Sequence, residues 1–444
     1  GNIHISQNDT IHLYGDTLYY YGFEDKAMVR SNVKLVNKDV VLTTHFLDYN
    51  RRSDVAYYFN RGQIVSGDNR LVSDWGYYYP QTDEAHFRKE VVVTNPDYTM
   101  YSDTLLYYTV TEVVKIVGPT TIISDRNEIY SELGSYDTHN DVARLEKNSY
   151  VKGEEQLLKG DTIFYDRKSG FGEVFSSMFL LDSANHVIIT GDYGYYNELE
   201  DKALATRNAV MMQISENDTL YLHADTLRAD PIEDTEYRII RAYHNVKFFR
   251  HDFQGRCDSM VYDLKDSINT FYKNPIIWAN LNQMSAGTIR LYTRNKTVYK
   301  AEMIDNAFVV APEDTAAFNQ IKGRNMTGYI RNNELYRIDV EGNGQTIYYP
   351  KDEDEVIGVN RAESSNLTLL LENRKVVGIV MRSAVSGNMN PPLILEAEST
   401  RLQGFRWLEE FRPKRMEDIF IKSEGPEPVE QVNYSDFHFD TTMP

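Results

Sequence analysis

The chain has almost no cysteine and no long apolar run. Its 444 residues include one cysteine, so no internal disulfide framework exists to indicate its compartment. No run of about 18 apolar residues is present, and this excludes a membrane-spanning helix from the sequence. Basic residues are also scarce, because 47 Lys and Arg stand against 66 Asp and Glu, for a formal net charge of -19. Nucleic acid and anionic membrane surfaces are therefore poor candidates as partners.

The motifs that mark many enzyme sites are missing as well. The sequence has no His-Glu-x-x-His motif, no phosphate-binding glycine loop, no Cys-x-x-Cys pair and no Gly-x-Ser-x-Gly elbow. Its ten histidines are scattered along the chain. We therefore predict that the protein is not an enzyme, and we assign it no catalytic residues, no metal site and no cofactor.

What the sequence does contain is a repeat with a period of 29 residues. Tyrosine recurs at this spacing, and two apolar columns keep the same register. A fixed period of this length is typical of a stacked array in which each unit buries its apolar face against its neighbours. Allowing for insertions in the later copies, about twelve repeats follow one another, and we predict a single repeat domain over residues 1–402.

A further column places a small residue directly before an acid. Apolar positions lie three residues before each acid and two residues after it, an odd offset that puts them on opposite faces of a straight strand. A bend at the small residue would bring both sets into one interior, with the acid hydrogen-bonded at the corner. Calcium binding between repeats and paired carboxylates are the alternatives. The column reads Gly15-Asp16, Ser73-Asp74, Ser102-Asp103, Ser131-Glu132, Gly160-Asp161, Gly191-Asp192, Ala224-Asp225 and Cys257-Asp258, with Thr44-His45 as the departure.

The segments between these corners have the composition of β-strands. Runs of about ten residues rich in Val, Ile, Thr, Tyr and Phe lie between turn signals, and their apolar residues lack helical spacing. We predict an all-β fold, an elongated repeat-built β-jelly-roll in which a folded-over antiparallel sheet forms a V-shaped trough. Cys257 stands in the small-residue column, so we interpret it as a compact corner residue rather than a reactive thiol.

The inward columns supply the candidate ligand-binding residues. The tyrosines share strand parity with Leu18, which places them on the inner face or its lip. Aromatic pairs across neighbouring strands stabilise a sheet by about 0.2–1 kcal/mol each, whereas tyrosines at a groove mouth can also meet head groups; both roles stay open. The predicted groove-lining residues are Leu18, Tyr20, Leu35, Leu42, Tyr49, Ile64, Leu71, Tyr78, Val93, Met100, Tyr107, Ile122, Ile129, Tyr136, Val151, Leu158, Tyr165 and Leu180.

At the corners the sequence resembles a known family. The run Asn32-Val33-Lys34-Leu35 and the small-Asp-x-Leu/Ile-x-Tyr pattern of residues 15–20 and 160–165 are similar to the OstA-like family, which includes LptA-type lipopolysaccharide transport proteins. The resemblance implies an antiparallel β-jelly-roll in the periplasm, with a signal peptide removed ahead of Gly1. It also implies lipopolysaccharide or a related glycolipid as ligand, acyl chains in the groove, and end-to-end contact with other lipopolysaccharide-transport components. The length of the chain leaves homo-oligomer formation open.

The C-terminal residues depart from the repeat. Phe405, Trp407 and Phe411 are available to cover an exposed edge, so we predict a capping segment over residues 403–424. The polar, proline-containing residues 425–444 are predicted to form a flexible tail. The alternative function is an extracytoplasmic β-solenoid that binds polysaccharide or acts as a structural spacer, and a carbohydrate enzyme ranks third. A lipid conduit needs an open apolar interior, whereas a glycan binder needs aromatic side chains on its outer face.

Overall fold

The computed structural model shows two compact units, Gly1–Ser215 (unit 1) and Glu216–Pro444 (unit 2). Both consist almost entirely of strands, and no α-helix occurs in the described residues. Nor does this part of the chain contain a helix that could cross a membrane. The predicted tail, residues 425–444, lies outside the described residues, which are 3–7, 10–215, 218–235, 237–294, 297–314, 316–332, 334–352, 355–373, 375–391 and 400–422.

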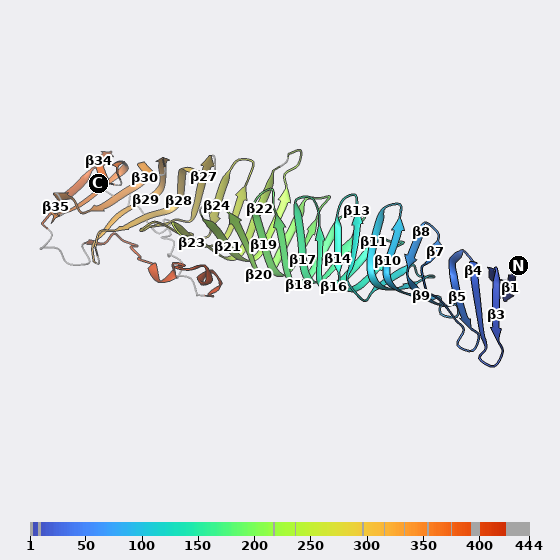
Figure 1. The fold of residues 1–444 in the computed structure, drawn as a ribbon. Helices are drawn as coiled ribbons and strands as arrows, with labels where there is room; N and C mark the ends of the chain where they lie inside the picture. Colours follow the sequence, from blue (N-terminus) through green and yellow to red (C-terminus); the bar gives the residue numbers. More distant parts are fainter. Residues whose placement is uncertain are drawn as a thin grey trace, which may run out of the picture. The chain divides into compact units, whose positions relative to one another are not determined.

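In unit 1 the strands follow one another in chain order and pair antiparallel (Figure 1). Their bounds are β1 Ile3–Gln7, β2 Ile11–Gly15, β3 Thr17–Tyr21, β4 Lys26–Asn37, β5 Val40–Asn50, β6 Val55–Tyr58, β7 Gly62–Ser66, β8 Asn69–Ser73, β9 Trp75–Tyr79, β10 Glu84–Asn95, β11 Tyr98–Tyr108, β12 Val113–Ile116, β13 Thr120–Ser124, β14 Glu128–Ser131, β15 Leu133–Asp137, β16 Val142–Lys152, β17 Gln156–Asp166, β18 Phe171–Asp182, β19 Val187–Asn197 and β20 Lys202–Ile214.

Unit 2 repeats this antiparallel arrangement and adds two short 3-10 helices. Its elements are β21 Thr219–Pro231, β22 Arg238–Arg250, β23 Phe253–Asp263, β24 Ile268–Tyr272, β25 Ile276–Ala279, β26 Asn282–Ser285, β27 Thr288–Arg294, β28 Thr297–Pro312, β29 Phe318–Arg331, β30 Glu334–Tyr348, β31 Lys351–Asp352, β32 Glu355–Val356, β33 Val359–Glu372, β34 Lys375–Arg382, β35 Ser386–Asn390, η2 Glu409–Phe411 and η3 Met416–Phe420.

The long strands bend at pairs of residues in the left-handed region. On β4, Ser31 and Asn32 have φ values of 63° and 48°, and the pairing with β5 shifts register between Arg30 and Val33. Two left-handed residues in succession turn the backbone sharply, and Asn tolerates this conformation better than most residues. The same device recurs at Asn60-Arg61, Lys89-Glu90, Lys147-Asn148, Ser176-Ser177, Arg207-Asn208, His244-Asn245, Lys273-Asn274, Asp305-Asn306 and Ser383-Ala384.

The chain bends at the small-acidic pair, as predicted, since β2 ends at Gly15 and β3 begins at Thr17, and the strands break in the same way at Asp74 and Glu132. The left-handed pair lies opposite, on the neighbouring strand. A Cβ atom on Gly160 would lie 2.1 Å from Cγ1 of Val174, and one on Gly15 would lie 2.2 Å from Cγ1 of Val29. These contacts are far shorter than van der Waals distance. Gly15 and Gly160 therefore leave room for a valine of the next strand.

The acids of the column hydrogen-bond the corner of the next strand, mostly through side chains. Nδ2 of Asn32 donates to Asp16 at 2.7 Å, and Nδ2 of Asn208 donates to Asp192 at 2.9 Å. The same arrangement joins Asn148 to Glu132, Ser177 to Asp161 and Asn245 to Asp225. Cys257 is buried in the same column, and burial raises the pKa of its thiol well above the usual range, which suits a packing role.

The corner divides the repeats into two arms. Arm A carries the tyrosine column and includes β3 and residues 26–30 and 46–50; arm B carries the apolar columns and includes β2 and residues 33–37 and 40–44. Leu42 and Leu47 lie on opposite sides of the corner in β5, yet both are buried. This burial confirms that the bent strands direct both apolar sets into one interior. We call the edge where the free ends of the two arms meet the mouth.

Candidate functional site

The two apolar columns of the sequence form one unbroken row across arm B of unit 1. Each member is the register partner of the next, so the columns alternate along the row. Every residue of this row in the predicted groove is buried. In order of pairing, the row reads Leu13, Leu35, Leu42, Ile64, Leu71, Val93, Met100, Ile122, Ile129, Val151, Leu158 and Leu180.

The tyrosines form a second row, across arm A, in which small residues alternate with the rings. Tyr49 pairs with Ala56, Ala56 with Tyr78, and Tyr78 with Ala85. Neighbouring tyrosines are thus two strands apart, about 9.6 Å, which is too far for direct cross-strand pairing. The intervening column, which the sequence reasoning missed although it has the same period, is Ala27, Ala56, Ala85, Val114, Ala143 and Gly172.

The two rows face each other and fill the interior. Ile64, Leu71 and Val93 of arm B line the same small cavity as Tyr107 and Val114 of arm A. Only about 10 Å³ remains there, barely the room that one water molecule needs, roughly 10–15 Å³. Around this cavity the predicted groove-lining residues are therefore packed together, and no open groove separates them.

Side chains also join the two arms directly across the mouth. Nδ2 of Asn37 in arm B donates to the Tyr78 hydroxyl at 2.5 Å, and Nδ2 of Asn127 donates to the Tyr165 hydroxyl at 2.6 Å. Burial, opposed by the amide of Asn37, raises the pKa of the Tyr78 hydroxyl. These bonds use the hydroxyls of Tyr78 and Tyr165, which phenylalanine would lack.

Arg167 makes the most extensive contact across the mouth. It follows β17, at the end of arm A, and its Nη2 donates to the carbonyl of Asp97, in the turn at the end of arm B, at 3.0 Å. Its guanidinium lies 5.6 Å from the ring centre of Tyr98, and that ring meets Tyr136 edge-on at 5.3 Å. Nη1 is 3.8 Å from Asp141, and the side chain is only 7% exposed. A buried cation thus fastens the two arms together.

The N-terminal end of the tyrosine row is the least covered. Tyr20 is 55% exposed, whereas Tyr78 is 6% exposed and Tyr136 is fully buried. Leu18 and Tyr49 are half-buried. Of the predicted residues, these three alone are accessible, so the interior of unit 1 approaches solvent at its first strands.

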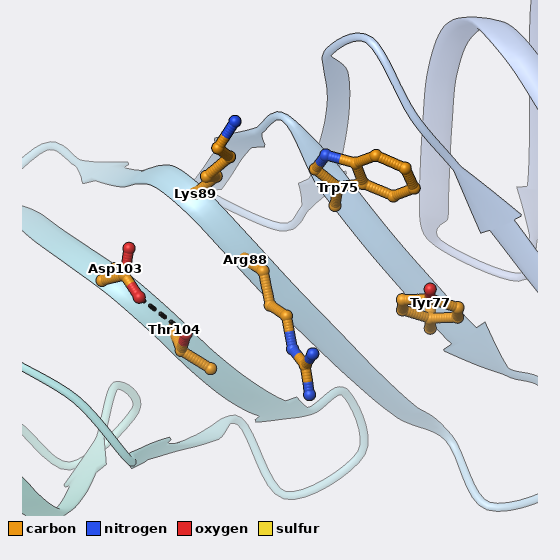
Figure 2. Close-up of a pocket in the computed structure, with 6 residues that line it drawn as sticks. All are labelled: Trp75, Tyr77, Arg88, Lys89, Asp103 and Thr104. Carbon is orange, nitrogen blue, oxygen red and sulfur yellow. Dashed lines mark hydrogen bonds between the residues drawn. The ribbon is translucent and has the colours of Figure 1, made fainter.

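The outer face of unit 1 carries a second feature, an aromatic and charged hollow. Figure 2 shows Trp75 and Tyr77 of β9 beside Arg88 and Lys89 of β10. Together with Asp103 and Thr104 of β11 they line a hollow of about 500 Å³. The hollow lies at the corner, because Lys89 belongs to a left-handed pair and Asp103 to the acidic column. It is therefore at the opposite end of arm A from the mouth.

The aromatic surface continues toward β4. Phe46 stacks on Phe59 at 5.3 Å, Phe59 lies 5.8 Å from Trp75, and the guanidinium of Arg30 lies 5.7 Å from the rings of Phe46 and Phe59. Tyr57 stacks on Tyr77 at 5.7 Å in the adjacent row. The outer face thus presents the aromatic side chains that a glycan binder needs, although the repeat columns gave no sign of them.

Asp48 is the buried anion of this outer face. Its carboxylate is 4% exposed and pairs with Arg30 at 2.7 Å and Lys26 at 3.0 Å, and the Tyr57 hydroxyl donates to it at 2.8 Å. Burial alone would raise the pKa of Asp48, but the bonds from Tyr57, Lys26 and Arg30 outweigh it and lower that pKa.

We expect Asp48 to make the stability of unit 1 depend on pH. Because its folded-state pKa lies below the unfolded value of about 3.9, its contribution is present at neutral pH and is lost as pH falls below about 4. The Asp48→Asn variant should be less stable than the unaltered protein at pH 7, and the difference should shrink by pH 3. Urea unfolding at both pH values measures this. Asp39→Asn, in an exposed turn, is the control, and a difference for Asp48→Asn that stays constant with pH would contradict the assignment.

The described residues contain no group of three or more His, Cys, Asp or Glu side chains that could hold a metal ion. Several acids of the column are instead engaged singly with donors of the neighbouring strand, as Asp16 is with Asn32.

Comparison with known proteins finds a family match over the N-terminal part of the chain. Residues 1–103 and 106–219 match the model of the OstA-like protein family, which confirms over these residues the resemblance drawn from the sequence. No curated protein matches the chain. Among solved structures, LptH from Pseudomonas aeruginosa, described as the LptA homologous periplasmic component of a lipopolysaccharide transport device, is similar at 12% identity. That match covers 23% of this chain and 79% of LptH, with a TM-score of 0.22, and a likeness this small carries no argument.

Proposed function

We propose that the protein is a periplasmic lipopolysaccharide-binding transport or bridge protein whose unit 1 shields acyl chains between its two arms. The OstA-like match over residues 1–103 and 106–219 carries this proposal, because that family includes lipopolysaccharide transport proteins. The unbroken apolar row from Leu13 to Leu180 supports it, because it offers one apolar track along the whole unit.

The chemistry of the row decides which part of the ligand it would hold. Each methylene moved from water into an apolar site contributes about 0.8 kcal/mol, so long acyl chains are the natural occupants. A net charge of -19 opposes anionic head groups. Affinity should therefore depend on acyl chains far more than on phosphates.

A packed interior requires that the ligand displace contacts in order to enter. The bonds across the mouth, Asn37 to Tyr78 and Arg167 to Asp97, are the contacts that must part along the unit. At the first strands less has to move, because Tyr20 is exposed. We infer that acyl chains enter at this end and advance as the mouth opens ahead of them.

The same end suits partners in an end-to-end bridge. Among the described residues β1 pairs with β2 and β3 with β4, and no second partner covers β1 or β3. Unpaired strand edges can add a strand from another protein. Other lipopolysaccharide-transport components, or a second copy of this chain, are the proposed occupants.

The alternative is an extracytoplasmic β-solenoid that binds polysaccharide on its outer face. The hollow lined by Trp75, Tyr77 and Arg88 favours it, because aromatic rings stack on sugars and charged groups bind their hydroxyls (Figure 2). One glycolipid could not place its saccharide in this hollow and its acyl chains in the interior, because the hollow lies at the corner and the mouth at the other end of arm A. The two functions therefore predict different contacts.

A small photoreactive alkyl diazirine residue at Ile64 or Val93 should capture lipid A and intact lipopolysaccharide. The same group at Lys168, in an exposed turn, is the control and should capture little. Unlabelled lipid A should compete, whereas the deacylated saccharide should not, and added salt should change capture little. If the deacylated saccharide competed and lipid A did not, and if Trp75→Ala abolished this competition, the glycan proposal would replace the lipid proposal.

A further inference from the structure

Residues 400–422 lie along arm B of unit 2, and we call them the strap. Figure 1 shows this segment in red, returning along strands β29 to β21. Nε2 of Gln320 donates to the carbonyl of Thr400 at 2.9 Å, and the amide of Leu402 donates back to Gln320 Oε1 at 2.8 Å. One side chain thus binds the strap backbone through both its donor and its acceptor, as a neighbouring strand would.

The same bond pattern repeats along the strap. Gln283 donates to the carbonyl of Arg406 at 2.9 Å and accepts from the amide of Leu408 at 2.8 Å. Further along, Nε of Arg412 donates to Gln254 Oε1 at 2.9 Å. We call Gln254, Gln283 and Gln320 the glutamine clasp.

The clasp belongs to the outer face of arm B. The inward row of unit 2 runs in register from Leu222 through Phe248 and Gly255 to Ile277. Gln254 and Trp278 are the chain neighbours of Gly255 and Ile277, so they point to the opposite face. Register partners run from Gln254 through Trp278 to Gln283, then through Val310 to Gln320, and all five are buried. The strap therefore buries an outer row of unit 2.

Apolar side chains of the strap complete the core of unit 2. Leu402 is 2% exposed and packs in one cluster with Phe308, Val310 and Phe318. Phe405 and Trp407 each lie 5.3 Å from the ring of Phe318. Without the strap this apolar surface would be open along the end of arm B.

The side chains of two lysines of arm B lie beneath the strap, and each donates a hydrogen bond to a backbone carbonyl of the strap. Nζ of Lys322 donates to the carbonyl of Gln403 at 2.8 Å, and Nζ of Lys247 donates to that of Ile421. Burial lowers the pKa of both lysines. At Lys247 the nearby Asp418 of the strap opposes this effect, whereas at Lys322 a neutral carbonyl compensates poorly for lost hydration. An anionic group would be a better partner for Lys322.

Resting on the function proposed above, we propose that the strap is a removable closure of a second binding site in unit 2 that takes an acylated anionic amphiphile. When the strap leaves, the surface around Phe318 and Val310 receives an acyl chain, and Lys322, the register partner of Phe308, faces its anionic head group. Because the strap contributes none of the paired strands, it can leave while the strand pairing of both arms is kept.

The test uses the full chain and lipid A with a photoreactive diazirine in one acyl chain, followed by mapping of the labelled peptides. Gln283→Ala with Gln320→Ala removes most of the clasp, and labelling of residues 300–350 should rise at least about tenfold, the change that about 1.4 kcal/mol makes in an equilibrium constant. Gln345→Ala is the matched control, because Gln345 lies on the same face but bonds to Glu363 of β33, at 3.4 Å, and not to the strap. A rise no larger than the control's would overturn the proposal.

A second measurement needs no substitution. In the unaltered protein, saturating lipid A should speed hydrogen exchange of the Leu402 and Leu408 amides, which the clasp protects, while amides of β28–β29 pairs stay protected. Unchanged exchange at Leu402 and Leu408 would also overturn the proposal. The site of labelling separates the proposed function from the role of the strap. Absence of labelling in unit 1 counts against the proposed function. Absence of labelling in unit 2 after loss of the clasp counts against the strap as the closure of a second site.

Discussion

Arg167→Gln should destabilise unit 1 and yet speed the capture of acyl chains. Removing one partner of a buried ion pair costs about 3–5 kcal/mol. The free energy of unfolding should fall by about 3 kcal/mol here, because the Asp141 side chain is partly exposed to water. The same change releases Asp97 and Tyr98 from arm A, so the mouth opens more often. Urea unfolding measures the first effect. The rate of lipid A capture by a diazirine residue at Val93 measures the second, which should increase several-fold.

Lys168→Gln is the matched control for this experiment. Lys168 is the next residue in the chain, is exposed, and donates to the carbonyl of His139 at 3.1 Å on its own arm. Its replacement should change the free energy of unfolding by less than about 0.5 kcal/mol and leave capture unchanged. If Arg167→Gln lowered stability without changing the capture rate, Arg167 would be a packing residue and not a closure of the mouth.

The rows of the interior could be predicted because they follow from one period. A residue that recurs at the repeat length occupies the same place in every repeat, so Leu35 and Ile64 must share a row once the chain stacks. The odd offset about the acid then requires a bend, and the joint burial of Leu42 and Leu47 confirms it. The left-handed pairs on the neighbouring strands were not predicted, since alternation of side chains in one strand does not report the backbone conformation of the strand beside it.

Closure of the mouth could not be predicted in the same way. Whether a trough is open depends on how closely two arms approach, and this distance is set by side chains far apart in sequence, such as Asn37 with Tyr78. Periodicity reports neighbours along the stack and carries no information about that approach. The outer cluster of Phe46, Phe59 and Trp75 was missed because it occurs in one region and does not repeat.

The glutamine clasp did leave a signal in the sequence. Gln254 and Gln283 have the same spacing as Met260 and Ile289, and Gln283 and Gln320 have the same spacing as Ile289 and Met326. The glutamines therefore keep the repeat register through an insertion. A buried polar residue needs a partner, and the strap is that partner. The segment predicted as a cap lies across successive strands of unit 2, where its backbone satisfies this requirement.

Gly160→Val should lower the free energy of unfolding of unit 1 by about 1–3 kcal/mol, the usual range for overpacking a core. The first added atom would lie 2.1 Å from Cγ1 of Val174 and 3.2 Å from the carbonyl of Ser176. Val174 is fully buried and cannot turn away into solvent. Urea unfolding followed by a spectroscopic signal from unit 1 measures the loss.

The control and the rescue both follow from the geometry around Gly160. Gly153→Val changes the unfolded chain in the same way, but the nearest atom to its new Cβ is 3.7 Å away, so its effect should stay within about 0.5 kcal/mol. Val174→Ala removes the Cγ1 atom that would clash with the new side chain of Gly160→Val. The double variant should therefore be more stable than the sum of the two single changes predicts, by about 1 kcal/mol or more. Additive costs would mean that the small column serves backbone flexibility and not the packing of one strand's valine against the next.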